Sequence, residues 1–173
     1  PSLRAGAVPV LLVLLVAWVF AAQEQELLGR VVAVTDGDTV KVLEGNNTLH
    51  KVRLVGIDAP ERSQPFGGAS RKSLESMVAG QQVVVRSVKH DKYGRVLGSV
   101  WVQPRDCPAC DKTLYVNHAQ VLAGMAWWYR YYADEQSEED RGRFESAERE
   151  AQARKWGLWE DPNPVPPWVW RRR

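Results

Sequence analysis

The stretch from residue 34 to residue 61 constrains the fold more than any other part of this chain. Residues 39–43 and 50–55 alternate between apolar and polar or charged side chains, which is typical of β-strands with one buried face. Residues 45–47, Gly-Asn-Asn, are turn formers and lie between the two segments. The pattern predicts an antiparallel hairpin at the centre of the domain.

Two carboxylates fall at the open end of the predicted hairpin. Asp38 and Asp58 are equidistant in sequence from Thr48, so an antiparallel pairing places them side by side. Carboxylates this close repel each other unless a positive charge lies between them. Ca²⁺ and Mg²⁺ bind carboxylate, carbonyl and water oxygens. The hairpin therefore predicts a site for a hard divalent cation.

Two further charged residues belong to this stretch. Glu61 follows Pro60, which stiffens the segment that leaves the strand. Strict alternation puts Arg53 and Asp58 on opposite faces, so their side chains converge only if the strand bends, and Gly56 allows a bend. A single acidic residue at a strand end is usually a solvated surface group, but four charged residues in this order favour a functional site.

Three blocks of sequence resemble the staphylococcal nuclease (thermonuclease) family. They are TDGDT at residues 35–39, RLVGIDAPE at 53–61 and DKYGR at 91–95, in that order. The similarity extends from about residue 28 to residue 159. It implies a calcium-dependent nuclease, a hydrolase that cuts DNA, RNA or both and leaves products that end in a 3′-phosphate.

The resemblance implies a set of metal ligands. Asp38, Asp58 and the backbone carbonyl of Ala59 would hold one Ca²⁺, and Asp36 would orient metal-bound water from outside the ligand set. The best-known members of the family carry threonine where this chain has Ala59. Because the ligand is a main-chain oxygen, alanine should still bind the metal.

The resemblance also implies catalytic and substrate-binding residues. Arg53 and Arg95 would clamp phosphate oxygens, because a guanidinium group donates two parallel hydrogen bonds. Glu61 would act as general base or orient the attacking water. The residues that would hold the terminal phosphate and the base of a bound nucleotide are Lys92, Tyr93, Tyr132 and Tyr129.

The predicted fold class is α+β with a mainly β core. Alternation or helical spacing predicts strands at 28–34, 39–43, 50–55, 82–89 and 96–102, and helices at 69–78, after Asn117 and after Ser137. Asn117 with Gln120 reads as a capping box. Five antiparallel strands with a helix after the third favour an OB-type barrel with about three helices, spanning residues 28–160.

Residues 1–22 read as an export signal. A basic flank precedes an apolar run that ends in small residues, as in a cleaved signal peptide, and the run is shorter than the roughly 20 residues of a membrane span. A signal anchor remains the alternative. We therefore expect a secreted or periplasmic protein, or a membrane-anchored one, with a polar spacer at 23–27.

Cys107 and Cys110 lie in a loop at residues 103–113. In an exported protein the expected interpretation is a local disulfide. A zinc half-site is the alternative, but the chain has no second cysteine pair and its histidines lack ligand spacing. A thioredoxin-like redox motif would need a βαβ context that the sequence does not show.

The end of the chain is aromatic, proline-rich and basic. The aromatic run at 127–132 is either core or a stacking surface for bases. The tail at 161–173 is predicted to be extended or disordered and to contact nothing, with membrane or nucleic acid as alternatives.

The composition sets limits on the function. At 173 residues the chain suits one domain, and a net charge of +2 gives no global attraction to nucleic acid. A calcium-dependent nuclease, acting as a monomer without a protein partner, is the favoured hypothesis. The rivals are a non-catalytic nucleic-acid-binding OB-fold module and an envelope-tethered structural protein, neither of which needs paired carboxylates with two arginines and a glutamate.

Overall fold

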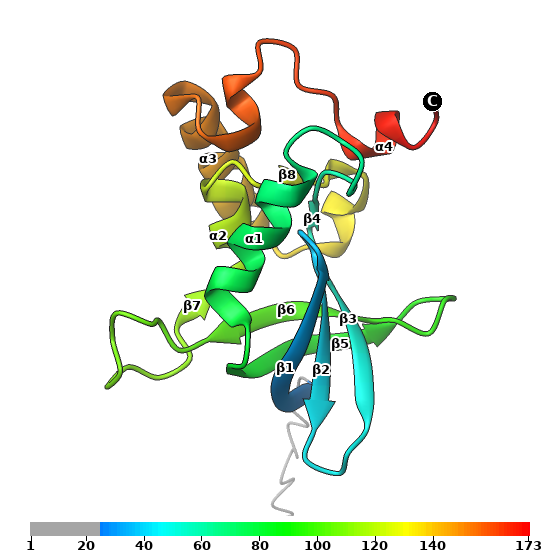
Figure 1. The fold of residues 1–173 in the computed structure, drawn as a ribbon, viewed down its shortest axis with the longest axis vertical. Coiled ribbons are helices and arrows are strands. Elements are labelled where there is room, and N and C mark those ends of the chain that lie inside the picture. Colours follow the sequence, from blue (N-terminus) through cyan, green and yellow to red (C-terminus); the bar gives the residue numbers. More distant parts are fainter. Residues whose placement is uncertain (1–24) are drawn as a thin grey trace, which may run out of the picture.

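Strands with alternating buried residues form a closed barrel. The computed structural model describes residues 25–173, apart from the side chains of residues 87 and 88. Its strands are β1 (Glu26–Asp36), β2 (Thr39–Glu44), β3 (Leu49–Leu54), β5 (Gln82–His90) and β6 (Val96–Val102). They follow the order β3-β2-β1-β5-β6, and a pairing of β3 with β6 closes the barrel (Figure 1). The predicted OB-type barrel is confirmed, although the closing pair is parallel rather than antiparallel.

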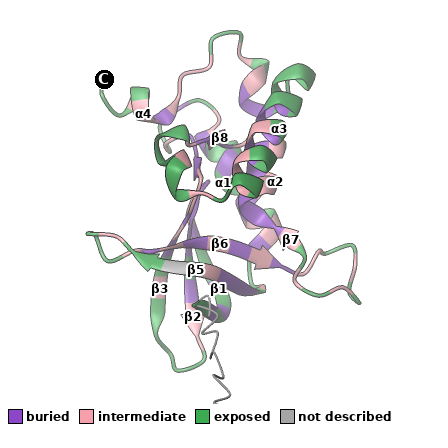
Figure 2. Cartoon of the chain, turned by 180° about the vertical axis from the view of Figure 1, so that it is seen from behind, coloured by how far each residue is buried: buried purple, intermediate pink, exposed green. Residues whose placement is uncertain are grey.

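Valine side chains fill the barrel. Val40, Val42, Val52, Val85 and Val100 are fully buried, and each contributes about 1.5–3 kcal/mol relative to an exposed position. The tips of the β2–β3 and β5–β6 hairpins are exposed instead (Figure 2). Burial therefore fixes the strand register, while the hairpin tips are available for contacts with other molecules.

Helices and short strands cover one end of the barrel. The three helices of seven or more residues in the described part of the chain match the predicted number: α1 (Gly67–Val78), α2 (Val116–Leu122) and α3 (Glu138–Arg154). Strand β4 (Ile57–Asp58) pairs with β8 (Trp127–Trp128), and β7 (Leu114–Tyr115) pairs antiparallel with the end of β6. The remaining elements are the 3₁₀ segments η1 (Arg130–Glu135) and η2 (Gly157–Glu160) and the short helix α4 (Pro167–Trp170).

Helix α3 starts where the sequence predicts. The Ser137 hydroxyl accepts a hydrogen bond from the Asp140 backbone N–H at 3.0 Å, as an N-cap residue does. After the helix the chain folds back, and the N–H of buried Leu158 donates to the Gly124 carbonyl at 2.8 Å. Helix α3 is thereby capped at its start, and the chain that leaves its end is fixed to the core.

The capping box predicted at Asn117 is wrong. Helix α2 begins at Val116 with Tyr115 as its N-cap, and no side chain caps it. The Asn117 side chain is buried, accepts from the Val100 N–H and donates to the Val55 carbonyl, both at 2.9 Å. The side chain satisfies buried backbone groups that the barrel leaves unpaired, which matters more than capping because an unpaired buried group is costly.

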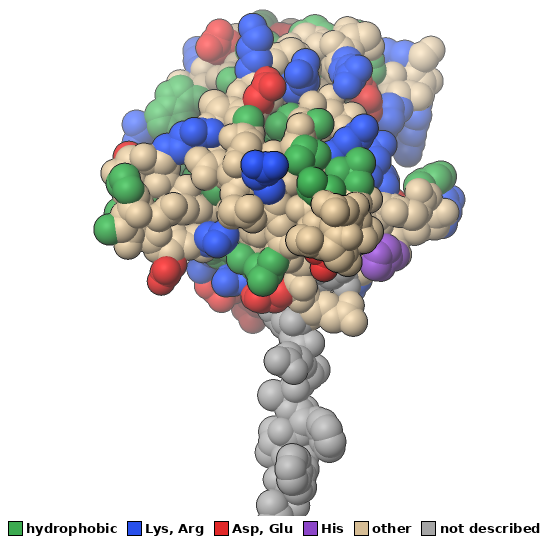
Figure 3. Space-filling view, turned by 60° about the horizontal axis from the view of Figure 1, so that its bottom comes forward, with side chains coloured by type: hydrophobic (Ala, Val, Ile, Leu, Met, Phe, Trp, Pro, Cys, Tyr) green, Lys and Arg blue, Asp and Glu red, His purple; other side chains and the backbone are tan. Residues whose placement is uncertain are grey.

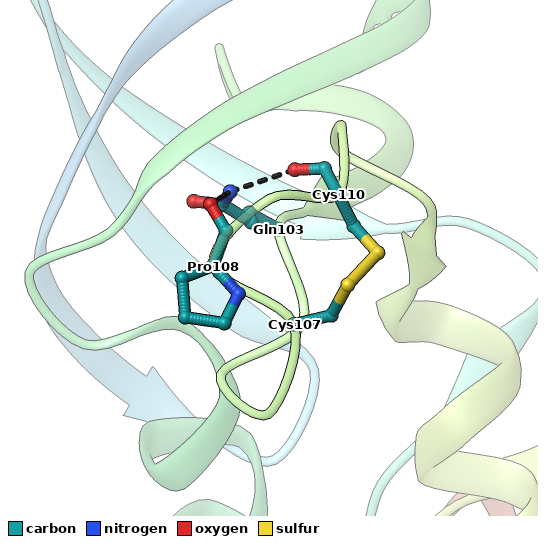
Figure 4. The surroundings of a disulfide bond; sticks show 4 residues. All are labelled: Gln103, Cys107, Pro108 and Cys110. Atoms are coloured by element: carbon teal, nitrogen blue, oxygen red, sulfur yellow. Dashed lines mark hydrogen bonds between the residues drawn. A yellow bond between two sulfur atoms is a disulfide. The ribbon is translucent and has the colours of Figure 1, made fainter.

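The cysteine loop is closed locally. Cys107 and Cys110 form a disulfide, and the Gln103 side chain donates to the Pro108 carbonyl at 2.8 Å and the Cys110 carbonyl at 2.6 Å (Figure 4). The disulfide and the glutamine together hold the loop that follows β6.

The prediction that the tail is disordered and contacts nothing is also wrong, although residues 161–166 lie outside any helix or strand. Residues 161–173 fold back over the domain and form α4, with Pro167 buried and the Trp168 ring centred 5.5 Å from the Tyr129 ring (Figure 1). Proline and tryptophan give the tail apolar surface to bury, and linker composition alone does not reveal this.

The predicted export signal at residues 1–22 lies outside the described residues. Within residues 25–173, no helix combines the length and apolar character needed to cross a bilayer.

Candidate active site

Asp38 and Asp58 lie together, but not as cross-strand partners. The Leu54 N–H donates to the Asp38 carbonyl at 2.8 Å, so Leu54 occupies the position opposite Asp38. The chain then turns at Gly56, which has a φ of +77°, and returns Asp58 to the site on β4. The predicted register was therefore wrong, while the predicted bend at Gly56 is present. A side chain there would also collide with the Phe144 ring, 2.6 Å from an added Cβ.

Arg53 joins the two carboxylates. Its Nη2 lies 2.9 Å from Asp58 Oδ1 and 3.1 Å from Asp38 Oδ2, so these oxygens are within two hydrogen-bond lengths of each other. Its Nη1 donates to the carbonyls of Leu54 at 2.8 Å and Ile57 at 2.9 Å. Both carboxylates are buried, and the shared guanidinium group reduces their repulsion.

Asp38 lacks sufficient positive charge around it. Its Oδ1 accepts from the Thr39 hydroxyl at 2.9 Å and its Oδ2 from the Ala59 N–H at 2.7 Å. Burial nevertheless raises the pKa of Asp38 from 3.8 to about 7, an effect that Arg53 opposes and Asp36 increases. A pocket that disfavours its own carboxylate is suited to a bound cation.

A third arginine reaches this site from the end of the chain. Arg171 Nη2 lies 2.7 Å from Asp58 Oδ2, and its Nη1 lies 2.7 Å from Glu61 Oε1 and 3.3 Å from Asp58 Oδ1. These bonds, that to Asp58 above all, raise the pKa of Arg171. The contact also shows that Glu61 lies beside the carboxylate pair. Sequence reasoning missed Arg171, because only the basic composition of the tail pointed to it.

The donor groups fit a hard cation. Asp38 and Asp58 supply buried carboxylate oxygens, and Ala59 is buried beside them, with its N–H bonded to Asp38; carboxylate oxygens suit Ca²⁺. Within the described residues, no three histidine, cysteine, aspartate or glutamate side chains form a metal-binding group. A cation here would therefore depend on two carboxylates, backbone oxygen and water.

Arg95 is near the site through its backbone. In the parallel pairing of β3 with β6, Arg53 lies opposite Leu97, so Arg95, two residues earlier, lies on the same face of the barrel. Its Nε bonds to Asp91 Oδ2 at 2.7 Å. The structure directs the guanidinium group of Arg95 to Asp91 rather than to the carboxylate pair.

Lys92 and Tyr93 lie at the tip of the β5–β6 hairpin. Tyr93 is 72% exposed, with the Lys92 Nζ 5.2 Å and the Arg95 guanidinium carbon 5.7 Å from its ring centre. Lys and Arg side chains are otherwise dispersed over the face shown in Figure 3 rather than gathered into one patch. The hairpin tip is therefore a local group of positive charge and exposed aromatic surface that could contact a polyanion.

Tyr129 lies closer to the carboxylates than Tyr132. The Tyr129 N–H donates to the Gly56 carbonyl at 2.9 Å, and burial, together with the charge of Asp58, raises the pKa of its phenol. Tyr132, whose ring centre is 5.2 Å from that of Tyr129, is 53% exposed. The structure therefore makes Tyr129 the inner and Tyr132 the outer aromatic group.

Buried polar side chains that the sequence did not identify hold the site. Gln120 Nε2 donates to the Gly37 carbonyl at 2.7 Å, which fixes the turn that carries Asp38. Glu148 accepts from the Trp128 N–H at 3.0 Å and fixes β8, the partner of Asp58's strand. Both polar side chains are fully buried on helices. A polar residue on the apolar side of a predicted helix is the sequence signal that could have identified them, because a buried polar group is normally hydrogen-bonded.

The fold and the site together define a class of protein. The barrel is of the OB type, and many barrels of this type bind nucleic acids. Its site combines a buried acidic pair and a shared arginine with exposed basic and aromatic groups, and arginine is well suited to contacts with phosphate. The family model described as "Staphylococcal nuclease homologue" matches residues 51–161. The chain belongs to this family.

Several curated relatives are similar over most of the chain. "Protein ParB" of Escherichia coli is 42% identical over 168 residues, covering 97% of this chain and 89% of that protein. A "Micrococcal nuclease" of Shigella flexneri is 41% identical over 173 residues, covering 99% and 92%. An "Uncharacterized endonuclease" of Escherichia coli is 39% identical over 148 residues, covering 86% and 87%.

Proposed function

We propose that this chain is a nuclease that hydrolyses phosphodiester bonds of DNA, RNA or both with the help of Ca²⁺ and leaves 3′-phosphate ends. The observation that carries the proposal is the buried pair of Asp38 and Asp58, joined by Arg53 with Glu61 beside it. Family membership and the names of the relatives support the nuclease activity. The metal and the position of cleavage rest on the resemblance and on the chemistry of the donor groups.

The metal-binding residues in this proposal are Asp38, Asp58 and the Ala59 carbonyl, with Asp36 orienting water. The bond from the Asp38 N–H to Asp36 Oδ1 at 3.3 Å ties Asp36 to the site and supports this role. When bound, the ion would neutralise the substrate phosphate and polarise its phosphorus–oxygen bonds.

Arg53 and Arg95 would stabilise charge on the phosphate. In the described chain, both Nη atoms of Arg53 are hydrogen-bonded to protein oxygens. Once Asp38 and Asp58 neutralise a cation instead, Nη2 of Arg53 can donate to a phosphate oxygen. Arg95 would have to exchange its bond with Asp91 for one to the phosphate.

Glu61 would take a proton from the attacking water. Its side chain is 41% exposed, so water can reach it. Lys92 and Tyr93 would hold the terminal phosphate, and Tyr129 and Tyr132 would stack on a base. Export and a monomeric state remain part of the proposal, and the export signal would be residues 1–22.

Cleavage assays with labelled DNA and RNA test this function. We expect cleavage with Ca²⁺, no cleavage after a chelator is added, and 3′-phosphate ends on the products. Equal cleavage with Ca²⁺ and with the chelator would exclude a role for the metal. Binding of nucleic acid without cleavage under either condition would favour the non-catalytic module.

A further inference from the structure

The segment of residues 161–173, the strap, is docked across the candidate active site. Trp168 packs on an aromatic cluster, with ring centres 5.5 Å from Tyr129, 5.7 Å from Trp127 and 5.9 Å from Tyr131. Gln64, three residues after Glu61, donates its side-chain N–H to the Val165 carbonyl. A cavity of about 40 Å³ between the strap and residues 60–66 is lined by both. The strap therefore packs on the loop that carries Glu61.

Arg171 is the part of the strap that enters the site. Its guanidinium group contacts both oxygens of Asp58 and one oxygen of Glu61, at 2.7, 3.3 and 2.7 Å. The Asp58 side chain is only 2% exposed, whereas that of Arg171 is 42% exposed. The arginine thus neutralises a buried carboxylate from the solvent side, where a cation or a phosphate would have to enter.

We propose that the strap is an autoinhibitory element in which Arg171 occupies the Asp58 oxygens that the catalytic cation would need, so that strap docking and Ca²⁺ binding exclude each other. This inference rests on the proposed function, because it takes Asp58 as a metal ligand and Glu61 as the base. It adds that the resting site is closed by the protein's own positive charge.

Two physical reasons support this exclusion. First, a cation that binds Asp58 alongside Arg171 would face a like charge at close range, and the carboxylate oxygens it needs already accept hydrogen bonds. Second, Glu61 Oε1 already accepts a hydrogen bond from Arg171 at 2.7 Å, so this oxygen is not free to accept one from an attacking water. One docked side chain therefore opposes both metal binding and proton transfer.

The strap is held by the packing of Trp168 and the bond to buried Asp58, while its other contacts are weak. Helix α4 has only four residues, and the Arg171–Glu61 pair is exposed on both sides, at 42% and 41%. Exposed ion pairs contribute little because water and salt screen them. An equilibrium between docked and released strap is therefore within the range that a differentially bound cation can shift.

Calcium titrations of the full chain test the inference. We expect Arg171→Ala to bind Ca²⁺ at least about fivefold more tightly than the unaltered chain in isothermal titration calorimetry, since coupling between sites typically lies in this range. Arg171→Gln, which keeps the bulk of the side chain, should behave in the same way. Arg172→Ala removes the neighbouring charge from an exposed residue and is the matched control, expected to leave the affinity unchanged.

Amide hydrogen exchange gives a readout that does not depend on activity. Ca²⁺ should speed exchange in the peptide that covers residues 165–173, because a released strap loses the hydrogen bonds of α4. In Arg171→Ala the same peptide should exchange fast even with a chelator present.

The outcomes separate the two proposals. Equal calcium affinities in the unaltered chain and both Arg171 variants, with unchanged strap exchange, would overturn the autoinhibition and leave the calcium-dependent nuclease standing. Failure of every variant to bind Ca²⁺ would overturn both. Tighter binding in Arg172→Ala as well would show a general charge effect and would also overturn the role of Arg171.

Discussion

Replacing Asp38 with asparagine should stabilise the metal-free protein at neutral and alkaline pH. Burial raises the pKa of Asp38 from 3.8 to about 7. A folded state that holds its proton to higher pH than the unfolded state loses stability as pH rises between these values. At one pKa unit per roughly 1.4 kcal/mol, ionised Asp38 costs the fold on the order of 4 kcal/mol above pH 7.

The gain in Asp38→Asn will be smaller than this cost. Asparagine keeps one acceptor for the Ala59 N–H, but its NH₂ group replaces the oxygen that accepts from the Thr39 hydroxyl. The pKa of about 7 already includes the opposing effect of Arg53, so only the bond to Thr39 is subtracted, at about 2–3 kcal/mol for a buried bond left unmade, which leaves an expected stabilisation of about 1–2 kcal/mol at pH 8. For a domain of this size that raises Tm by roughly 2–8 °C.

Thermal unfolding from pH 4 to pH 9 with a chelator is the measurement. The unaltered chain should lose stability between about pH 4 and pH 7, and Asp38→Asn should lack this part of the profile. Saturating Ca²⁺ should stabilise the unaltered chain more than the variant. Parallel pH profiles for the two proteins would refute the claim that Asp38 is electrostatically strained.

Three further predictions concern single residues. Glu61→Gln should lower kcat by roughly 10²–10⁴-fold, the usual contribution of a general base, with Tm unchanged because Glu61 is exposed; unaltered turnover would remove it from the mechanism. Arg95→Ala should lower kcat/KM by a factor similar to that for Glu61→Gln, whereas Arg95→Lys should retain only part of the original kcat/KM. Full activity of Arg95→Lys would argue against a bidentate phosphate contact. Gln120→Leu should lower stability by about 1–3 kcal/mol, because it leaves the buried Gly37 carbonyl without its donor, and chemical denaturation that shows no loss would contradict this.

Local pattern was sufficient for most of the fold. Strand β6 was predicted at its observed bounds because Val96, Gly98, Val100 and Val102 alternate with residues that face outward. Helix α3 was predicted from Ser137, whose hydroxyl caps it. These features depend on neighbours in sequence, so the sequence carries them directly.

The site was harder to predict because it depends on contacts between distant segments. Alternation along β3 gives no information on the return of Asp58 through β4, which required the turn at Gly56 and a partner strand seventy residues later. The interior role of Asn117 required knowledge of which backbone groups the closed barrel leaves unpaired. Arg171 reaches Asp58 across 113 positions of sequence, and no local pattern encodes such a contact.

Because strand β4 has only two residues, the position of Asp58 depends on the elements packed against that strand. Asp58 pairs with Trp127, and the adjacent Trp128 is latched by Glu148 in the middle of α3. If helix α3 frayed, the bond from Glu148 to β8 would be lost. Strand β4, which pairs with β8, would then hold Asp58 less rigidly, although no group in the pocket itself had changed. Helix α3 therefore helps to position Asp58 from outside the pocket, through the buried carboxylate of Glu148.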